Sequence, residues 1–549
     1  MKARFIAVLA GIGIGYGLLL FKLADVQLAK NGSYLARAQA QYEAAGFLYA
    51  PRGTIYFTDK NGNPLPVAVD KDFPLVYAVP KTIDDALEAG QRLSAVLGVS
   101  ADELTAVFLK KTSYEVLKKR VDPEVVKAVE ELGLKGVYVA QIPGRYYPLG
   151  NLASHLVGFV GEDEKENRER GRYGLEAFYD ELLSGVNGEL DDGKLTPPAP
   201  GGDLRVTVDP TIQLEAERIL SALVAKHGAE GGNVIVQEPK TGKLLAAASV
   251  PTFDPNSYGK TPLSHFLNPV VQQIYEPGSV FKVLTMSAGI DAGKITPETT
   301  YVDKGSATIS GRKIENWDLK THGPHGRVTM TGVIENSINT GAIFAQQQTG
   351  NETFKEYLTR FGFGEKTGVD MAGELSGDVK LLFRRDAPAV AFATASFGQG
   401  VAATPLQIIN AFSVIANGGV LMHPYVNAAL APKEVRRVIS QDTAKKVAKM
   451  MVSAVDKAEI ARISGYSIAG KTGTAFIPDF TRGGYTDLVI NTYVGFGPAS
   501  DPRFVILFKL NKPQGAPLAG TTVVPAFREL AQFLLNYYQM PPDRITTSN

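Results

Sequence analysis

Ser279 and Lys282 are the first residues whose types and spacing could do chemistry, in the stretch Tyr-Glu-Pro-Gly-Ser-Val-Phe-Lys. A Pro-Gly pair interrupts the chain just before the serine, and the apolar run after it predicts a buried helix that ends near Gly289 or Gly293. Side chains three residues apart lie on one face of a helix, so the lysine amine would reach the serine hydroxyl. A serine becomes a nucleophile when a base takes its proton, and a lysine serves as that base when burial and nearby positive charge lower its pKa.

A Ser-x-x-Lys spacing alone is a weak indication, because an ordinary helix start has the same composition. The chain carries a second copy, from Ser257 to Lys260, between Pro-Asn and Thr-Pro pairs that are typical of loops. No apolar helix follows that copy. The catalytic interpretation of Ser279 and Lys282 therefore depends on motifs further along the chain.

The second motif is Ser337-Ile338-Asn339, the one Ser-x-Asn in the sequence. Serine and asparagine also favour caps and turns, so a purely structural cluster is the alternative interpretation. The run Ala-Ile-Phe-Ala follows shortly after the motif, which places its polar residues at a junction where side chains can point into a cleft. This position favours a functional role.

The third motif is Lys471-Thr472-Gly473, followed by a second threonine, in a strand-like segment with small residues on both sides. Two other Lys-Thr-Gly copies lie at residues 240–242, in a predicted hairpin turn, and at residues 366–368, in a predicted loop. Glycine allows another backbone to approach closely. The copy at Lys471 therefore suits a strand whose edge pairs with an extended peptide substrate.

In this order and context, Ser-x-x-Lys, Ser-x-Asn and Lys-Thr-Gly are the motif set of penicillin-binding proteins and serine β-lactamases. The chain resembles a class B penicillin-binding protein, a monofunctional peptidoglycan D,D-transpeptidase, almost from end to end. Other segments similar to the family begin at Arg52, Arg145, His155 and Phe397. The resemblance implies an α+β chain whose catalytic domain has the penicilloyl serine transferase fold, with an antiparallel sheet flanked by helices.

The resemblance also implies a role for each motif residue. Ser279 would attack the carbonyl between the two terminal D-alanines of a stem peptide, and Lys282 would take its proton. Ser337 would relay a proton to the departing D-alanine, and Asn339 would hold the catalytic lysine and a substrate amide. The backbone N–H groups of Ser279 and Thr474 would form the oxyanion hole. A β-lactam would acylate the same serine and stay there.

The remaining roles concern substrate binding. Lys471 would lower the pKa of the catalytic lysine and attract the terminal carboxylate of the substrate. Thr472 and Thr474 would hydrogen-bond that carboxylate, with Gly473 between them on the substrate-binding strand. Trp317, the single tryptophan of the chain, would line the cleft or belong to a core or flap. The chemistry implies no cofactor and no metal ion.

Composition sets the class of protein. The chain has 549 residues, which is enough for two or three domains with substantial cores. It is 44% hydrophobic and 21% charged, with a net charge of +1, so nothing indicates a nucleic-acid partner. Cysteine is absent, which excludes disulfides and fits an extracytoplasmic protein without proving one.

The N-terminus predicts a single membrane anchor. Lys2 and Arg4 precede an uncharged run from Phe5 to Phe21, and Lys22 could snorkel from its end. The basic residues in front place the N-terminus in the cytoplasm and the rest of the chain outside a bacterial plasma membrane. The alternative is a cleaved signal peptide, but the nearest Ala-x-Ala sites lie too far beyond the apolar run.

The predicted organisation follows from these features and from a Pro/Gly-rich stretch near residue 200. In order, we expect a cytoplasmic N-terminus (1–4), a transmembrane helix (5–24), a non-catalytic pedestal or dimerisation-type domain (25–195), a linker (196–204), the transpeptidase domain (205–540) and a C-terminal tail (541–549). Within these, helices are predicted at residues 83–97, 122–133, 209–227 and 527–538, and strands at residues 233–237, 244–250, 493–497 and 505–510.

Other interpretations remain open at this point. One is a membrane-anchored β-lactamase, because β-lactamases share the motifs; they are usually short, soluble domains, however, and the anchor and the long first domain speak against this interpretation. Another is a β-lactam sensor, which would need a larger membrane region. An inert scaffold subunit of a wall-synthesis complex is a third. Within the family, the segment Ser396–Gly400 and the residues before Lys471 favour a division role over an elongation role. Either type implies a polytopic membrane glycosyltransferase partner of the shape, elongation, division or sporulation kind. The Gly11/Gly15 or Gly13/Gly17 faces of the anchor could contact that partner, and the alternative is that small residues are simply common in such segments.

Overall fold

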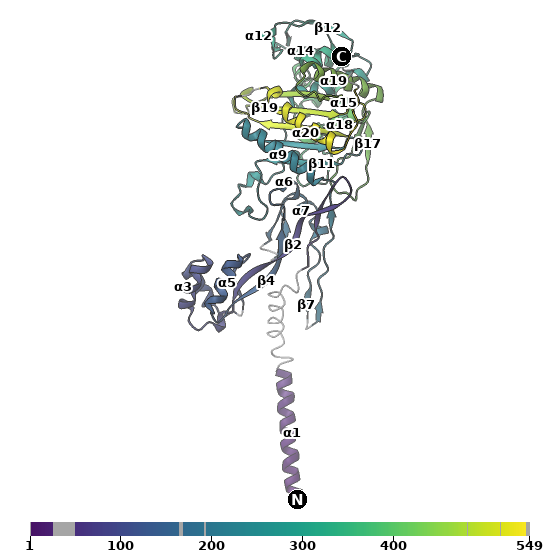
Figure 1. The fold of residues 1–549 in the computed structure, drawn as a ribbon. Coiled ribbons are helices and arrows are strands. Elements are labelled where there is room, and N and C mark those ends of the chain that lie inside the picture. Colours follow the sequence, from purple (N-terminus) through teal and green to yellow (C-terminus); the bar gives the residue numbers. More distant parts are fainter. Residues whose placement is uncertain are drawn as a thin grey trace. The chain divides into compact units, whose positions relative to one another are not determined.

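The computed structural model describes residues 2–25, 50–112, 114–163, 168–191, 194–479, 481–515 and 518–544 (Figure 1). The chain forms two compact units that alternate along the sequence. The pedestal unit holds Met1–Thr54, Ala68–Tyr146 and Glu181–Asp203, and the catalytic unit holds Ile55–Val67, Tyr147–Asp180 and Leu204–Asn549. The domain limits expected from the sequence stay predictions, and residues 545–549 of the expected tail lie outside the described residues.

Helix α1 (Lys2–Ala24) covers the predicted anchor. Among the residues that the structure describes, no helix meets the combined length and apolarity needed to cross a membrane. The spanning anchor therefore stays a prediction.

Five antiparallel strands form the sheet of the catalytic unit, in the order β11-β10-β20-β19-β18. Their bounds are β10 (Gly231–Gln237), β11 (Leu244–Val250), β18 (Ala469–Pro478), β19 (Tyr485–Gly497) and β20 (Phe504–Asn511). Two of the three inner strands, β10 and β20, are buried along almost their whole length, because helices cover both faces of the sheet. The expected α+β class with a helix-flanked antiparallel sheet is confirmed.

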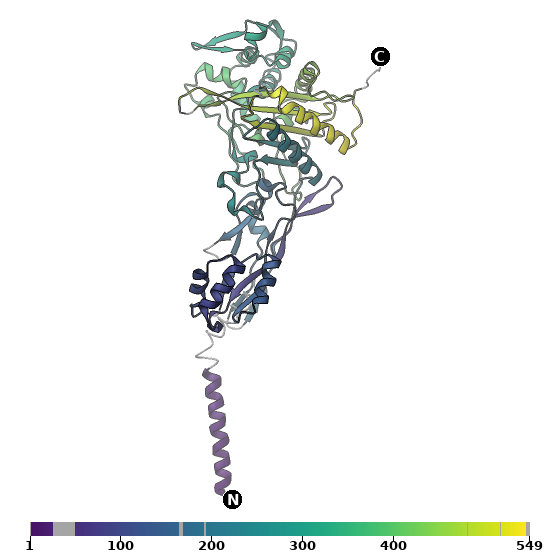
Figure 2. The ribbon, with the colours of Figure 1, turned by 60° about the vertical axis from the view of Figure 1, so that its left-hand side comes forward.

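Two helices from distant parts of the chain cover one face of the sheet. They are α9 (Pro210–Lys226) and α20 (Val523–Tyr537), which lie on the same side of the sheet in Figure 2. Their apolar side chains join those of alternate strand residues in one buried core that includes Leu220, Phe527, Val234 and Phe508. Each such side chain contributes roughly 1.5–3 kcal/mol on burial.

The opposite face of the sheet carries the helices that hold the catalytic motifs. Helix α18 (Pro405–Ala416), buried on all sides, packs on β10 and β20. Helix α19 (Gln441–Ala458) and the 3₁₀ turn η5 (Gly278–Phe281) pack against the edge strand β18. Helix α11 (Lys282–Asp291) continues directly from η5 and is buried over nearly its full length.

The other elements of the catalytic unit connect and cover this layered core. They are β1 (Ile55–Thr58), α6 (Ser154–Val157), β5 (Val160–Asp163), β6 (Arg168–Gly171), α7 (Gly174–Phe178), β9 (Leu204–Arg205), α10 (Pro269–Gln272), β12 (Thr300–Asp303), β13 (Ser306–Ile309), β14 (Arg312–Glu315), α12 (Leu319–His322), β15 (Gly326–Thr329), α13 (Met330–Asn336), α14 (Asn339–Thr349), α15 (Asn351–Arg360), α16 (Lys380–Phe383), α17 (Ala389–Ala395), β16 (Val420–Met422) and β17 (Glu434–Arg437).

The pedestal unit packs three helices on a small antiparallel sheet. Its helices are α3 (Ala86–Leu97), α4 (Ala101–Phe108) and α5 (Pro123–Leu132), and its strands include β2 (Pro64–Ala78, from residue 68 on), β3 (Glu115–Lys118), β4 (Val137–Tyr146), β7 (Glu189–Asp191) and β8 (Lys194–Thr196). Asp85 caps α3 with its side chain, and Gly133 ends α5 in the left-handed conformation. The buried Arg145 guanidinium pairs with Asp70 at 3.3 Å.

Candidate active site

Ser279 lies in a turn that two glycines hold in place. Gly278 adopts a left-handed φ of +61° and donates its N–H to the Gly398 carbonyl oxygen at 3.1 Å. A Cβ on Gly398 would lie 2.2 Å from the Gly278 carbonyl oxygen, so the two loops can approach this closely only with glycine at 398. This backbone contact fixes the position from which the half-buried Ser279 emerges.

Lys282 begins α11 one turn after the serine and is completely buried. Its Nζ donates to the Ser337 carbonyl oxygen at 2.5 Å and to the Ser337 Oγ at 3.2 Å. Burial and the nearby charge of Lys471 hold the pKa of Lys282 well below its usual value, while Asp318 acts in the opposite direction. An amine in this environment becomes available as a base at a lower pH than an exposed lysine.

Ser337 occupies the junction between two helices. It ends α13 with a left-handed φ of +55°, which is uncommon for a residue other than glycine. Helix α14 begins two residues later, at Asn339. The interruption turns both the side chain and the carbonyl group of Ser337 toward the lysine, as the two hydrogen bonds from Lys282 show.

Lys471 reaches the same serine from the edge strand β18. Its Nζ donates to the Ser337 Oγ at 2.9 Å and to the Thr472 carbonyl oxygen at 3.0 Å. Burial lowers the pKa of Lys471 to about 7. The structure thus brings Lys282, Ser337 and Lys471 together from three elements that lie far apart in the sequence.

Strand β18 lies directly against the turn that carries Ser279. A Cβ on Gly473 would lie 2.7 Å from the Pro277 carbonyl oxygen, and a Cβ on Gly278 would lie 3.0 Å from the Thr474 carbonyl oxygen. The Thr474 hydroxyl accepts a hydrogen bond from the Ala519 N–H at 3.3 Å. β18 pairs with β19 on one side only, and among the described residues no strand pairs with its outer edge.

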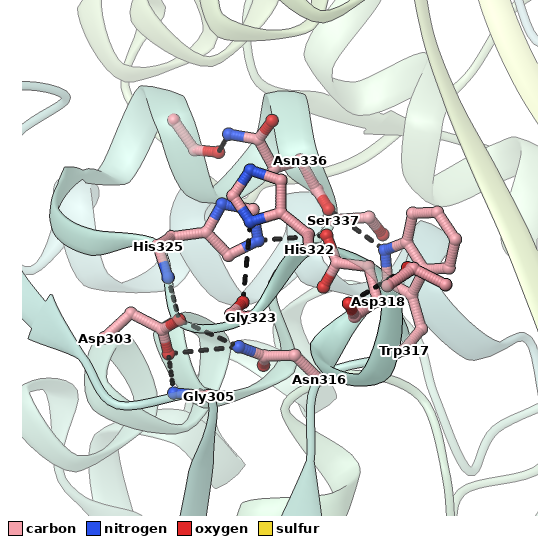
Figure 3. A network of polar contacts seen from close by, with 12 residues as sticks. Asp303, Gly305, Asn316, Trp317, Asp318, His322, Gly323, His325, Asn336 and Ser337 are labelled. Atoms are coloured by element: carbon pink, nitrogen blue, oxygen red, sulfur yellow. Dashed lines mark hydrogen bonds and ion pairs between the residues drawn. The ribbon is translucent and has the colours of Figure 1, made fainter.

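Asn339 and Trp317 lie at the rim of this cluster. Asn339 donates to the Glu315 carbonyl oxygen at 2.9 Å, and the contact with Lys282 that the family resemblance implies stays a prediction. The Trp317 side chain is 60% exposed, and its Nε1 donates to the Asn336 carbonyl oxygen at 3.1 Å, next to Ser337 (Figure 3). The tryptophan is therefore not a core residue.

A polar network beside Trp317 was not singled out from the sequence. Asp318 and His325 pair at 3.0 Å, and the His322 ring stacks on the His325 ring with 4.3 Å between the centroids (Figure 3). One ligand atom from each of these three residues lies within 4.8 Å of the others, so they could hold a divalent cation. The expected absence of a metal ion stays a prediction.

Glu276 is a second residue that sequence reasoning missed. Its carboxylate accepts hydrogen bonds from the Gly400 N–H at 2.8 Å and from the Tyr485 hydroxyl at 3.0 Å. Burial raises the pKa of Glu276. The carboxylate therefore links the segment that carries Ser279 to the 398–400 loop and to the start of β19. Its position three residues before Ser279 is the sequence feature that could have pointed to it.

Comparison with known proteins agrees, over both units, with the family resemblance drawn from the sequence. The model of the penicillin-binding protein transpeptidase domain matches residues 232–532, and that of the penicillin-binding protein dimerisation domain matches residues 47–192. Stage V sporulation protein D of Bacillus subtilis is 33% identical over 548 residues, which span 92% of this chain and 82% of that protein. Peptidoglycan D,D-transpeptidase FtsI of Escherichia coli is 28% identical over 100% of this chain and 94% of its own length.

A solved structure shows the same fold. Penicillin-binding protein 3 from Mycobacterium tuberculosis, complexed with aztreonam, aligns with a TM-score of 0.70 and 26% identity, over 90% of this chain and 98% of that one. The family identified from the three motifs is confirmed, while its division-type branch is not resolved and stays a prediction. The chain belongs to the penicillin-binding proteins that combine a dimerisation domain with a transpeptidase domain.

Proposed function

We propose that the chain is a serine-type peptidoglycan D,D-transpeptidase that cross-links stem peptides through an acyl-enzyme at Ser279. The observation that carries the proposal is the Ser337 hydroxyl held between the buried amines of Lys282 and Lys471, beside the turn that presents Ser279. The named relatives and the aztreonam complex support the same class of reaction.

The first half-reaction forms the acyl-enzyme. The Ser279 Oγ attacks the carbonyl carbon of the terminal D-Ala-D-Ala bond, and its proton passes to the neutral amine of Lys282. The backbone N–H groups of Ser279 and Thr474 stabilise the negative charge on the carbonyl oxygen. The C–N bond then breaks, a proton reaches the departing amine, and free D-alanine leaves an ester on Ser279.

Ser337 is suited to deliver that proton. Its oxygen accepts hydrogen bonds from both lysine amines, which engages its two lone pairs. The hydroxyl hydrogen is then free to donate away from the lysines, toward the leaving amine. Lys282 would replace this proton, so the proton taken from Ser279 ends on D-alanine.

The second half-reaction transfers the peptide to an acceptor. The amine of a neighbouring stem peptide attacks the ester carbonyl and loses a proton to Lys282. The Ser279 C–O bond breaks, and the serine recovers its hydrogen. In both steps the donor peptide lies along the outer edge of β18. In the first step, before D-alanine leaves, its terminal carboxylate lies near Lys471, Thr472 and Thr474.

The test is labelling of the purified chain with a fluorescent penicillin, followed by intact mass measurement over several hours. Wild type should gain one stable adduct, and Ser279→Ala should gain none. The matched control is Ser257→Ala in the second Ser-x-x-Lys copy, which should label like wild type. A rapidly lost adduct with consumption of penicillin would instead indicate a β-lactamase, and no adduct in wild type would favour an inert scaffold.

We also propose that α1 anchors the chain in a bacterial plasma membrane, with the catalytic unit outside. The uncharged run from Phe5 to Phe21 behind Lys2 and Arg4 supports this topology. Deleting residues 2–25 should move the protein from the membrane fraction to the soluble fraction. Retention of the deletion variant in the membrane would contradict the anchor.

The partner proposed for the anchor is a polytopic membrane glycosyltransferase that supplies the glycan. The glycines at 11 and 15 leave open space on α1, which suits close packing of a second helix. Replacing Gly11 and Gly15 with leucine should reduce co-purification of that partner. Unchanged co-purification would remove this face from the proposal.

A further inference from the structure

Lys509 is a buried lysine that the proposed reaction does not use. It lies in β20, within the apolar run Phe-Val-Ile-Leu-Phe-Lys-Leu, and its side chain is 0% exposed. Burial alone lowers its pKa, to about 7. An apolar residue at an inner position of a sheet would cost less free energy, so the presence of a lysine here calls for a specific interaction.

Lys509 belongs to a row of polar or small residues that crosses the whole sheet. In register, Ser249 pairs with Asn233, Asn233 with Lys509, Lys509 with Thr492, and Thr492 with Gly473. Directly paired residues of neighbouring strands point to the same face. The row ends at the glycine of the Lys-Thr-Gly motif, and a Cβ on that glycine would meet the Pro277 carbonyl oxygen.

The amine of Lys509 contacts the segment that leads to the nucleophile at two alternate residues. Its Nζ donates to the Gln273 Oε1 at 2.9 Å and lies 4.9 Å from the centre of the Tyr275 ring. Residues two apart on an extended segment point the same way, which lets one amine hold both. On the other side, Tyr275 exchanges backbone hydrogen bonds with Ala403, each of 3.0 Å.

The polar row therefore holds the segment before Ser279 at two points. Lys509 holds it at residues 273 and 275, and Gly473 contacts its backbone at Pro277. Ser279 follows two residues later, in the short 3₁₀ turn η5, so a shift of the segment would move the serine with it. A displacement of about 1 Å at a reacting atom can lower a rate by roughly 100-fold.

The geometry points to Lys509 as a positioning residue for the acylation of Ser279, acting through Gln273 and Tyr275. This inference rests on the proposed function. It assigns Lys509 no contact with substrate, and it places the effect in the acylation step rather than in binding or stability.

The test compares Lys509→Met with wild type in the full chain. Methionine keeps the aliphatic stem and removes the donors and the charge. We expect the acylation rate constant for penicillin to fall about 10-fold to 100-fold. The dissociation constant of the non-covalent complex should change less than about 2-fold, and Tm should stay the same or rise because a buried amine is removed. The matched control is Lys512→Met, which removes a partly exposed lysine just beyond the end of the same strand.

The partner side separates positioning from a general effect on folding. Gln273 is exposed, so its replacement removes no buried apolar side chain and changes only the acceptor that faces Lys509. Gln273→Met should reproduce most of the loss in acylation, Gln273→Glu should restore it by keeping an acceptor, and Gln273→Met should add nothing to Lys509→Met.

Two results would overturn the inference: acylation of Lys509→Met at the wild-type rate, or a loss that Lys512→Met shares. Failure of wild type itself to acylate would instead remove the proposed function.

Discussion

Lys471 sets one limb of the expected pH dependence at the scale of single residues. Its pKa of about 7 means that the free protein loses this positive charge as pH rises through neutrality. The pKa of Lys282 lies well below its usual value, so Lys282 becomes neutral and able to act as a base at lower pH than an exposed lysine would. Acylation efficiency should therefore rise with pH as Lys282 deprotonates and fall near pH 7 as Lys471 does.

Lys471→Met tests this assignment. The variant should lose the alkaline limb of the pH profile, because the group that titrates there is gone. Its acid limb should move to higher pH, because the positive charge that lowers the Lys282 pKa has been removed. A stopped-flow profile of acylation efficiency against pH measures both limbs. Persistence of the alkaline limb in the variant would assign it to another group.

Ser337 combines a chemical role with an unfavourable backbone conformation. Its φ of +55° costs a non-glycine residue roughly 1–2 kcal/mol. Ser337→Ala and Ser337→Gly both remove the hydroxyl, and removal of a proton-transfer group should lower the acylation or transfer rate by about 10²–10⁴-fold in each. The glycine variant alone should gain stability, by about 1 kcal/mol relative to alanine.

Chemical denaturation and penicillin kinetics on the same two variants separate these effects. Rates that fall equally while stability differs would support the hydroxyl as the proton relay. A rate that recovers in the glycine variant would show instead that backbone strain, and not the hydroxyl, limits the reaction.

At the scale of elements, the contact between β18 and η5 decides whether the motifs meet. Gly473 makes this contact possible. A Cβ at 473 would lie 2.7 Å from the Pro277 carbonyl oxygen, which belongs to the backbone and cannot move aside as a side chain could. Gly473→Ala should push the strand from the turn and lower penicillin acylation by roughly 100-fold, as expected for a 1 Å displacement. Gly259→Ala is the control, because a Cβ at 259 meets nothing within 4 Å. Wild-type labelling by Gly473→Ala would show that the strand tolerates the displacement.

At this scale, the sequence predicted some elements correctly and missed contacts that the fold creates. The hairpin strands predicted at residues 233–237 and 244–250 agree with β10 and β11, because a short apolar run, Val-Ile-Val in the first and Leu-Leu-Ala-Ala-Ala in the second, sets each strand. The helix predicted at 209–227 agrees with α9, because Asp209 caps it with its side chain. The turn at Ser279 is a short 3₁₀ segment rather than the first turn of an α-helix, since Gly278 reverses the chain against Gly398, a contact that no local pattern contains.

The residues of the candidate site likewise fall into those that motif spacing predicted and those that depend on tertiary contacts. Ser279, Lys282, Ser337 and Lys471 could be named from motif spacing, because the chemistry restricts the residue types. The hydrogen bond of Asn339, the carboxylate of Glu276 and the amine of Lys509 depend on tertiary contacts across more than a hundred residues or on a neighbouring loop. For these residues, the sequence shows the side chain but does not show which other residue it contacts.

At the scale of the whole chain, the catalytic unit is discontinuous in sequence. It includes Ile55–Val67 and Tyr147–Asp180 as well as everything from residue 204 onward. A fragment cut at the predicted linker, residues 205–549, would therefore lack part of its own core. The Tyr179 hydroxyl, which donates to Asp370 at 2.7 Å, would be lost.

Phe159 would be lost with it, and this side chain contacts Phe253 and Phe266 at centroid distances of 5.8 and 4.9 Å. Both remaining rings are buried in the full chain and would become exposed in the fragment.

We expect the fragment 205–549 to melt roughly 5 °C or more below a longer fragment, 50–549, which keeps every segment of the unit. Both fragments lack α1, so the anchor contributes to neither melting temperature. Tyr179→Phe in the longer fragment should account for a small part of the difference, because it removes one hydrogen bond, worth about 0.5–3 kcal/mol, to a buried carboxylate. Differential scanning calorimetry measures all three proteins. Equal melting temperatures for the two fragments would mean that the predicted linker, and not the interleaved arrangement, marks the limit of the folding unit.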